Sequence, residues 1–257
     1  MLAGTLPSMN LIRLALLSAA LAGTSLAATG PGSFRVDAPM KMIKTELPVF
    51  PQSALVKGLR HGEARVAIAV DATGRLTDYL VLYYTFSSFA DAAITAVKTW
   101  RFEPMRIGGI SRASVANLKF TFEAEGAITN LDIMANEAEF FKSIDLDPVA
   151  FSACMPRDLD RIPTPIKIVQ PVLPDEPGRS AQRGQVTVKF FIDDHGRVRL
   201  PRVSSVSRAA NEELAASAMV DAAVAAVAQW QFEPPLSKGK PTIVLVAQDL
   251  DFPPVAP

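Results

Sequence analysis

The sequence has very few of the residues that carry most metal and redox chemistry. Among 257 residues there are one cysteine and two histidines. A single cysteine excludes an internal disulfide and a multi-cysteine metal site, and two histidines leave little for a zinc cluster. There is also no excess of charge, because 26 Lys and Arg residues balance 26 Asp and Glu residues. We therefore expect no cofactor, no metal and no nucleic-acid partner.

Long apolar runs are also missing, with one exception near the N-terminus. Residues 11–28 are almost wholly apolar and contain one charge, Arg13, before the stretch Leu14 to Leu26. This stretch of 13 residues, or 15 when it is counted to Ala28, is shorter than the ~20 that a transmembrane helix needs. Its end overlaps Ser25-Leu26-Ala27, a small-x-small cleavage pattern. We predict a signal peptide over residues 1–28 and no membrane span in the mature chain. The alternative is an uncleaved anchor in the inner membrane.

What the sequence does contain is an internal repeat. Three motifs occur twice in the same order: a Pro-x-x-Pro segment, an Asp-x-x-Gly-Arg turn and a Trp-x-Phe-x-Pro segment. In the first copy they are Pro48–Pro51, Asp71–Arg75 and Trp100–Pro104, and in the second copy Pro171–Pro174, Asp193–Arg197 and Trp230–Pro234. Such self-similarity predicts two related units. We place them at residues 45–123 and 166–253. An acidic linker over 124–165 separates them and contains either a short helix (136–143) or a mobile tether.

Each copy predicts the same order of elements, α-β-β-α-β. A short helix precedes a strand with alternating apolar residues, and Asp-x-x-Gly-Arg closes a hairpin to the second strand. An alanine-rich helix then places Ala93, Val97 and Trp100 on one face, as it does Ala223, Val227 and Trp230. This register makes both tryptophans core residues rather than ligand platforms. The predicted fold class is α+β, with two small three-stranded antiparallel sheets, each with helices on one face.

The order of these motifs resembles the C-terminal domain of the TonB energy-transducer family. The second copy carries the closest pattern, with Gly184 to Asp193, Trp230 to Pro234 and Gly239-Lys240-Pro241. The first copy lacks a Lys-Pro pair after Gly109. The resemblance covers nearly all of the chain outside the predicted signal and linker. It implies a non-enzymatic periplasmic protein-interaction module that needs no cofactor.

Members of this family bind a short segment of an outer-membrane receptor by adding it as a strand to the edge of the sheet. The resemblance implies the third strand of each copy as that edge. The candidate residues are Val115, Asn117, Lys119 and Thr121 in the first copy and Ala247, Asp249 and Asp251 in the second. The implied partners are peptides of envelope proteins, such as TonB-dependent receptors, and the implied role is energy transduction for transport across the outer membrane.

Two departures from the family leave the energy-transducing role open. The apolar N-terminal segment contains Ser18 but no histidine, whereas a full transducer carries both in its anchor. A short connection also replaces the long Pro-, Lys- and Glu-rich spacer. A second hypothesis is therefore a structural or self-associating protein that uses the same sheet edges to form a homodimer.

No motif predicts catalysis. The sequence contains no nucleotide-binding loop, no Gly-x-Ser-x-Gly and no His-Glu-x-x-His, so we expect no catalytic residues and no enzyme. Asp193-Asp194-His195 could suggest a metal loop, but it lacks the alternating carboxylates of a calcium site. The first copy has the same turn without a histidine. A hairpin turn is therefore the favoured interpretation.

Overall fold

The computed structural model describes residues 36–107, 109–124, 128–133, 151–173, 184–208 and 213–252. The predicted signal peptide, the predicted linker helix and the short helix expected after Pro174 lie outside these residues. The described elements are β1 (Val36–Ala38), β2 (Lys41–Lys44), α1 (Gln52–Val56), β3 (His61–Val70), β4 (Leu76–Tyr84), α2 (Ser87–Val97), β5 (Arg101–Glu103), β6 (Met105–Ile107), β7 (Ile110–Arg112), β8 (Ser114–Glu123), β9 (Ile128–Ile133), β10 (Phe151–Ser152), the 3-10 helix η1 (Pro156–Asp158), β11 (Pro165–Lys167), β12 (Gly184–Ile192), β13 (Val198–Arg208), α4 (Glu213–Val227), β14 (Gln231–Phe232), β15 (Leu236–Ser237), β16 (Lys240–Pro241) and β17 (Val244–Phe252).

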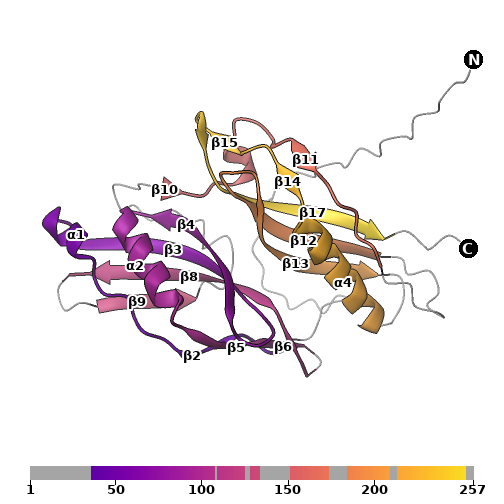
Figure 1. Cartoon of the computed structure of the whole chain (residues 1–257), viewed down its shortest axis with the longest axis horizontal. Coiled ribbons are helices and arrows are strands. Elements are labelled where there is room, and N and C mark those ends of the chain that lie inside the picture. The colour runs from indigo at the N-terminus through magenta and orange to yellow at the C-terminus, as the bar shows by residue number, and fades with distance from the viewer. Residues whose placement is uncertain are drawn as a thin grey trace, which may run out of the picture.

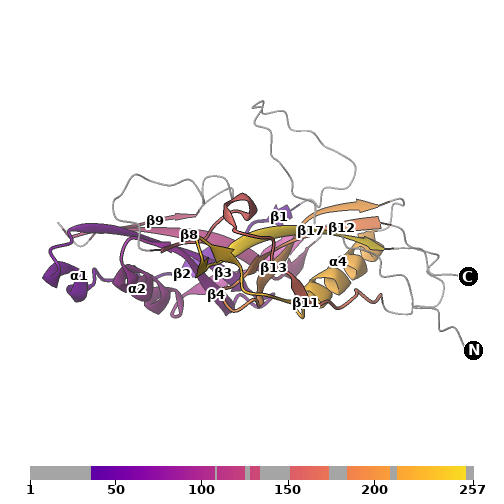
Figure 2. The ribbon, with the colours of Figure 1, turned by 90° about the horizontal axis from the view of Figure 1, so that it is seen from above.

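The chain is a mixed α+β protein built mostly of antiparallel strands. Figure 1 shows β3, β4, β8 and β9 on one side of the molecule and β11, β12, β14 and β17 on the other, with α1 and α2 at one end and α4 at the other. Seen from above, the two units lie side by side along the long axis (Figure 2). Each helix packs on the sheet of its own unit.

The first unit has a five-stranded sheet in the order β10-β4-β3-β8-β9. The prediction of three strands was therefore incomplete, because residues 128–133 and 151–152 of the predicted linker supply its two outer strands. The even-numbered residues of β3, such as Val66 and Ile68, are fully buried beneath α2 together with Phe89 and Trp100. This burial confirms Trp100 as a core residue.

The second unit has a three-stranded sheet in the order β13-β12-β17, as the sequence predicts. β12 is the central strand and pairs with β17 without a register shift from Gly184 to Ile192. Helix α4 covers one face through Met219, Ala223 and Val227, which pack with Trp230. At 3% exposure Trp230 is also a core residue.

The two repeated motifs are joined by a close backbone contact. Gly196 of the hairpin turn has a φ of +78°, and its carbonyl accepts a hydrogen bond from the N–H of Phe232 at 2.8 Å. Gly74 makes the same contact with Phe102 at 3.2 Å. Only a residue without a Cβ fits here, because a Cβ on Gly196 would lie 1.9 Å from the carbonyl oxygen of Phe232. The Asp-x-x-Gly-Arg and Trp-x-Phe-x-Pro motifs therefore occur together because one packs against the other.

The faces of the two sheets that carry no helix are packed against each other. A shared apolar cluster lies between the units and consists of Ala67, Leu80, Leu82, Ala153, Phe191, Leu200, Ile243 and Leu245. Arg199 of β13 adds a two-pronged ion pair to Asp78 of β4, and it also donates to the carbonyl of Tyr79 at 2.9 Å. The two units thus share a third core, and β3 is buried on both of its faces.

Candidate functional site

The outer edge of β17 is the best-defined open sheet edge in the described part of the chain. β17 is the last strand of its sheet, and its one described outer partner is Cys154, which forms a parallel bridge with Val244. In that bridge the N–H of Cys154 donates to the carbonyl of Ile243 at 2.8 Å. The outward backbone groups of this strand therefore belong to odd-numbered residues, because alternate residues present their backbone groups to opposite sides.

This alternation places three of the candidate residues with their backbone groups directed outward. They are Ala247, Asp249 and Asp251, and no described strand pairs with their outer side. Their side chains lie on the face opposite the core. The carboxylate of Asp249 accepts from the hydroxyl of Thr187 at 2.6 Å, and that of Asp251 accepts from the amide of Gln185 at 2.9 Å. Both carboxylates are exposed, so the edge is acidic.

The corresponding edge of the first unit is largely occupied by the chain itself. β9 pairs with β8 from Leu118 to Glu123, which places Lys119 opposite Asp132 and Thr121 opposite Asn130. The prediction that Lys119 and Thr121 lie on an open edge was therefore wrong. Val115 and Asn117 precede the paired segment, and Val115 packs against the cluster between the units.

The sequence does not predict β9, because the apolar residues of this strand do not alternate regularly. The segment Ile-Thr-Asn-Leu-Asp-Ile has apolar side chains at its first, fourth and sixth positions, and it follows an acidic stretch that suggests a linker. Its three β-branched residues were the available signal, since such residues favour strands.

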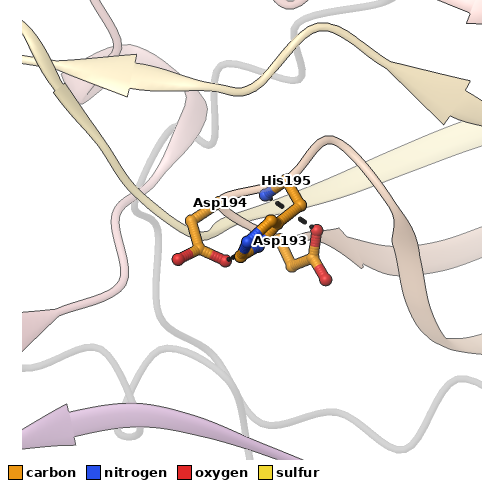
Figure 3. A group of neighbouring side chains, drawn as sticks. All are labelled: Asp193, Asp194 and His195. Atoms are coloured by element: carbon orange, nitrogen blue, oxygen red, sulfur yellow. Dashed lines mark hydrogen bonds and ion pairs between the residues drawn. The ribbon is translucent and has the colours of Figure 1, made fainter.

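The Asp193-Asp194-His195 group closes a turn. Asp193 Oδ1 accepts from the backbone N–H groups of His195 at 3.0 Å and Arg197 at 2.9 Å, and its Oδ2 accepts from Arg197 Nε at 2.8 Å. Burial raises the pKa of the Asp193 carboxyl, but these hydrogen bonds outweigh burial and leave that pKa lowered. Figure 3 shows His195 directed toward Asp194, with Nδ1 and Oδ1 2.8 Å apart.

The three side chains of this turn are close enough together to contact one metal ion. However, both oxygens of Asp193 are already engaged by protein donors, and Arg199 lies 3.6 Å from Oδ2. A cation at this position would be repelled by the two guanidinium groups. The geometry therefore favours the structural role of a hairpin turn, and Asp71 closes the first-copy turn in the same way by accepting from Thr73 and Arg75.

The single cysteine lies beside the candidate edge, and we expect its thiol to react slowly. Burial is the main cause that raises the pKa of the Cys154 thiol to about 11. Since only the thiolate is nucleophilic, we expect iodoacetamide to alkylate Cys154 in the folded protein at pH 8 about 100-fold more slowly than in denaturant. Mass spectrometry of the alkylated fraction over time measures both rates. Equal rates would show that the thiol is open and reactive.

No helix in the described residues combines the length and the apolar character needed to cross a bilayer.

Comparison with known proteins gives one family. A family model described as the Gram-negative bacterial TonB protein C-terminal matches residues 46–124 and 169–253, together more than half of the chain. No curated protein matches the sequence. TonB C-terminal domains are protein-interaction domains that generally contact outer-membrane receptors. The resemblance noted from the motifs is thus confirmed for both copies, and the chain belongs to the TonB C-terminal family, with two matching segments in tandem.

Proposed function

We propose that this chain binds a short extended segment of an envelope protein as an added strand at the outer edge of β17. The observation that supports this most directly is the outward direction of the backbone groups of Ala247, Asp249 and Asp251 on the last strand of the sheet. An incoming strand would satisfy these N–H and C=O groups by main-chain hydrogen bonds. The site we propose needs no catalytic residue.

The acidic character of the edge supports a partner segment with basic residues. Asp249 and Asp251 are exposed and lie on one face of β17. Opposite charges on neighbouring strands stabilise pairing, whereas like charges directly opposite each other destabilise it. Antiparallel pairing of two β17 strands around Asp249 would bring identical carboxylates together. This favours a different protein over a second copy of the chain as the partner.

We further propose that the protein works in the periplasm after its signal peptide is removed, with receptor segments as the partner class. The first unit would then contribute mainly by holding the second in place, because β9 already occupies most of its corresponding edge. Whether the chain also transmits energy depends on an anchor and a spacer that resemble those of the full transducers. N-terminal sequencing of the protein from periplasmic and membrane fractions tests the cleavage.

The strand-addition proposal predicts different effects for two proline variants. Ala247→Pro removes one outward N–H and leaves the β12 ladder intact, so we expect binding to fall at least tenfold. Asn117→Pro alters the equivalent position of the first unit and should leave binding within twofold. Isothermal titration calorimetry measures both, with synthetic peptides of the N-terminal periplasmic segments of outer-membrane receptors as probes.

Thermal unfolding of each variant serves as the control for folding. If Ala247→Pro binds as tightly as the parent protein while remaining folded, strand addition at β17 is wrong. If the parent protein instead forms a dimer by light scattering and Ala247→Pro is a monomer, the edge serves self-association and the partner is a second copy.

A further inference from the structure

A small apolar pocket lies next to the candidate edge, on the helix-covered side of the second sheet. It has a volume of about 260 Å³ and is lined by residues that include Ile162, Pro163, Pro165, Trp230, Phe232 and Gln248. The segment that carries Ile162 to Pro165 runs into β11, which pairs with β14 beside Trp230. The pocket therefore lies between the end of the linker and the core of the second unit.

Gln248, one of the residues that line this pocket, has a polar atom without a partner. Gln248 is only 5% exposed, and its side-chain N–H donates to the carbonyl of Asp249 at 2.9 Å. Its Oε1 is buried and has no hydrogen-bond partner among the described residues. An unpaired buried acceptor is costly, so such an atom in a natural protein calls for an explanation.

The first unit shows that the fold does not require a polar residue at this position. Gln248 pairs with Val188 of β12, and the equivalent partner of Val66 in β3 is Leu118. Leu118 is fully buried in the apolar core. Leucine at position 248 would thus avoid the cost of the unpaired amide oxygen, and the glutamine is better explained by a ligand group that reaches it.

We propose that the pocket receives an aromatic side chain with a single hydrogen-bond donor, such as the indole of tryptophan or the phenol of tyrosine. Its walls of proline and aromatic rings suit a flat apolar group, and its volume of about 260 Å³ exceeds the ~150 Å³ of a cavity that holds benzene. Because Oε1 is itself buried, a rotation of the Gln248 amide would bring it to this donor. Because Gln248 lies between Ala247 and Asp249, we assign the side chain to the added strand. That source, though not the pocket itself, rests on the proposed function.

The pocket can be tested without any peptide, by titrating the full chain with free indole and with 1-methylindole in NMR experiments. The two ligands have the same ring, but the methylated one has no N–H donor. We expect indole to shift the resonances of the Trp230 indole and the Gln248 amide, and to bind at least fivefold more tightly than 1-methylindole. Absence of these shifts, or equal affinities, would overturn the proposal and indicate that water satisfies Oε1.

A variant then tests the role of the amide oxygen. Gln248→Met keeps the length of the side chain and removes the strong acceptor, so we expect the two ligands to bind it equally. Retention of the fivefold preference would contradict the assignment of Oε1. If this variant does not fold, the comparison of indole with 1-methylindole on the parent protein still tests whether the pocket binds an N–H donor.

The source of the side chain is decided by the peptide experiments. We expect a bound receptor peptide to compete with indole, and a Trp→Leu or Tyr→Leu change in that peptide to weaken binding at least tenfold. If a peptide binds β17 without displacing indole, strand addition stands but the anchor side chain is wrong. If indole binds and no peptide does, the pocket takes a free aromatic compound. In that case the pocket proposal stands and the strand-addition proposal is wrong.

Discussion

Replacement of Phe191 by alanine is expected to lower the free energy of unfolding by about 3–5 kcal/mol. Phe191 is 1% exposed and lies in the cluster between the two units, where it packs with Leu200 and Leu245 of its own unit and Leu82 of the other. The loss combines the transfer of a large apolar side chain with the cavity left in a packed interior. Guanidinium denaturation followed by tryptophan fluorescence measures it, since each unit contains one tryptophan.

The control for this variant is Ile110→Ala. Ile110 is also a large apolar residue in a strand, but it is 59% exposed, so its truncation should change stability by less than about 0.5 kcal/mol. We also expect Phe191→Ala to separate the unfolding of the two units, because the cluster is the main apolar contact between them. A small loss with a single unchanged transition would show that the units do not depend on this interface.

The second large effect is expected from Gly196→Ala. The new Cβ would lie 1.9 Å from the carbonyl oxygen of Phe232, which is a backbone atom and cannot rotate away. The hairpin or the Trp-x-Phe-x-Pro strand must then move, and the hydrogen bond between Gly196 and Phe232 is lost. We expect the midpoint of thermal unfolding to fall sharply, with a loss of at least ~3 kcal/mol.

Gly239→Ala separates this steric effect from backbone strain. Gly239 has a φ of +73°, close to the +78° of Gly196, but no atom lies within 4 Å of the position of its Cβ. This variant should cost only the ~1–2 kcal/mol of a left-handed backbone. Equal losses for the two variants would mean that the contact with Phe232 contributes nothing beyond the conformation of the glycine.

The elements within each copy could be predicted from the sequence because their signals are local. The alternation along β3 and β12, the glycine in the hairpin turn and the helical spacing of Trp100 and Trp230 with small apolar residues all involve neighbours within one or two turns. The structure places these residues as expected. The two tryptophans also have equivalent partners. The indole N–H of Trp100 donates to the carbonyl of Glu46, and that of Trp230 donates to the carbonyl of Val169, which is the equivalent residue of the second copy.

The packing of one sheet on the other could not be obtained in the same way. It depends on pairs of surfaces more than 100 residues apart in the chain. The alternation of apolar residues along a strand identifies one buried face of the sheet, but it does not show what covers the other face. A signal was present, because Leu80, Leu82, Phe191 and Leu245 are large apolar residues on the face expected to meet solvent. Such residues on both faces of a strand indicate a sheet buried on both sides.

The edge strands of the first unit were missed for a related reason, since β9 and β10 come from beyond the repeated segment. Of the seven candidate residues for peptide binding, Ala247, Asp249 and Asp251 lie on an open edge, whereas Lys119 and Thr121 are paired with β9. An internal repeat identifies only the elements that both copies share. It therefore carries no information on a strand that only one copy acquires.

The two linker strands change what counts as an independent piece of this protein. The family match ends at residue 124, but the sheet of the first unit is completed only by Ser152, after β9 has joined one side and β10 the other. A fragment cut at the family boundary would expose unpaired backbone along the outer sides of β4 and β8, where β10 and β9 pair in the whole chain. Expressed alone, it would be prone to aggregation and could bind peptides that the intact chain excludes. During synthesis the first unit likewise reaches its final form only after β10 has been made, well beyond the family boundary at residue 124.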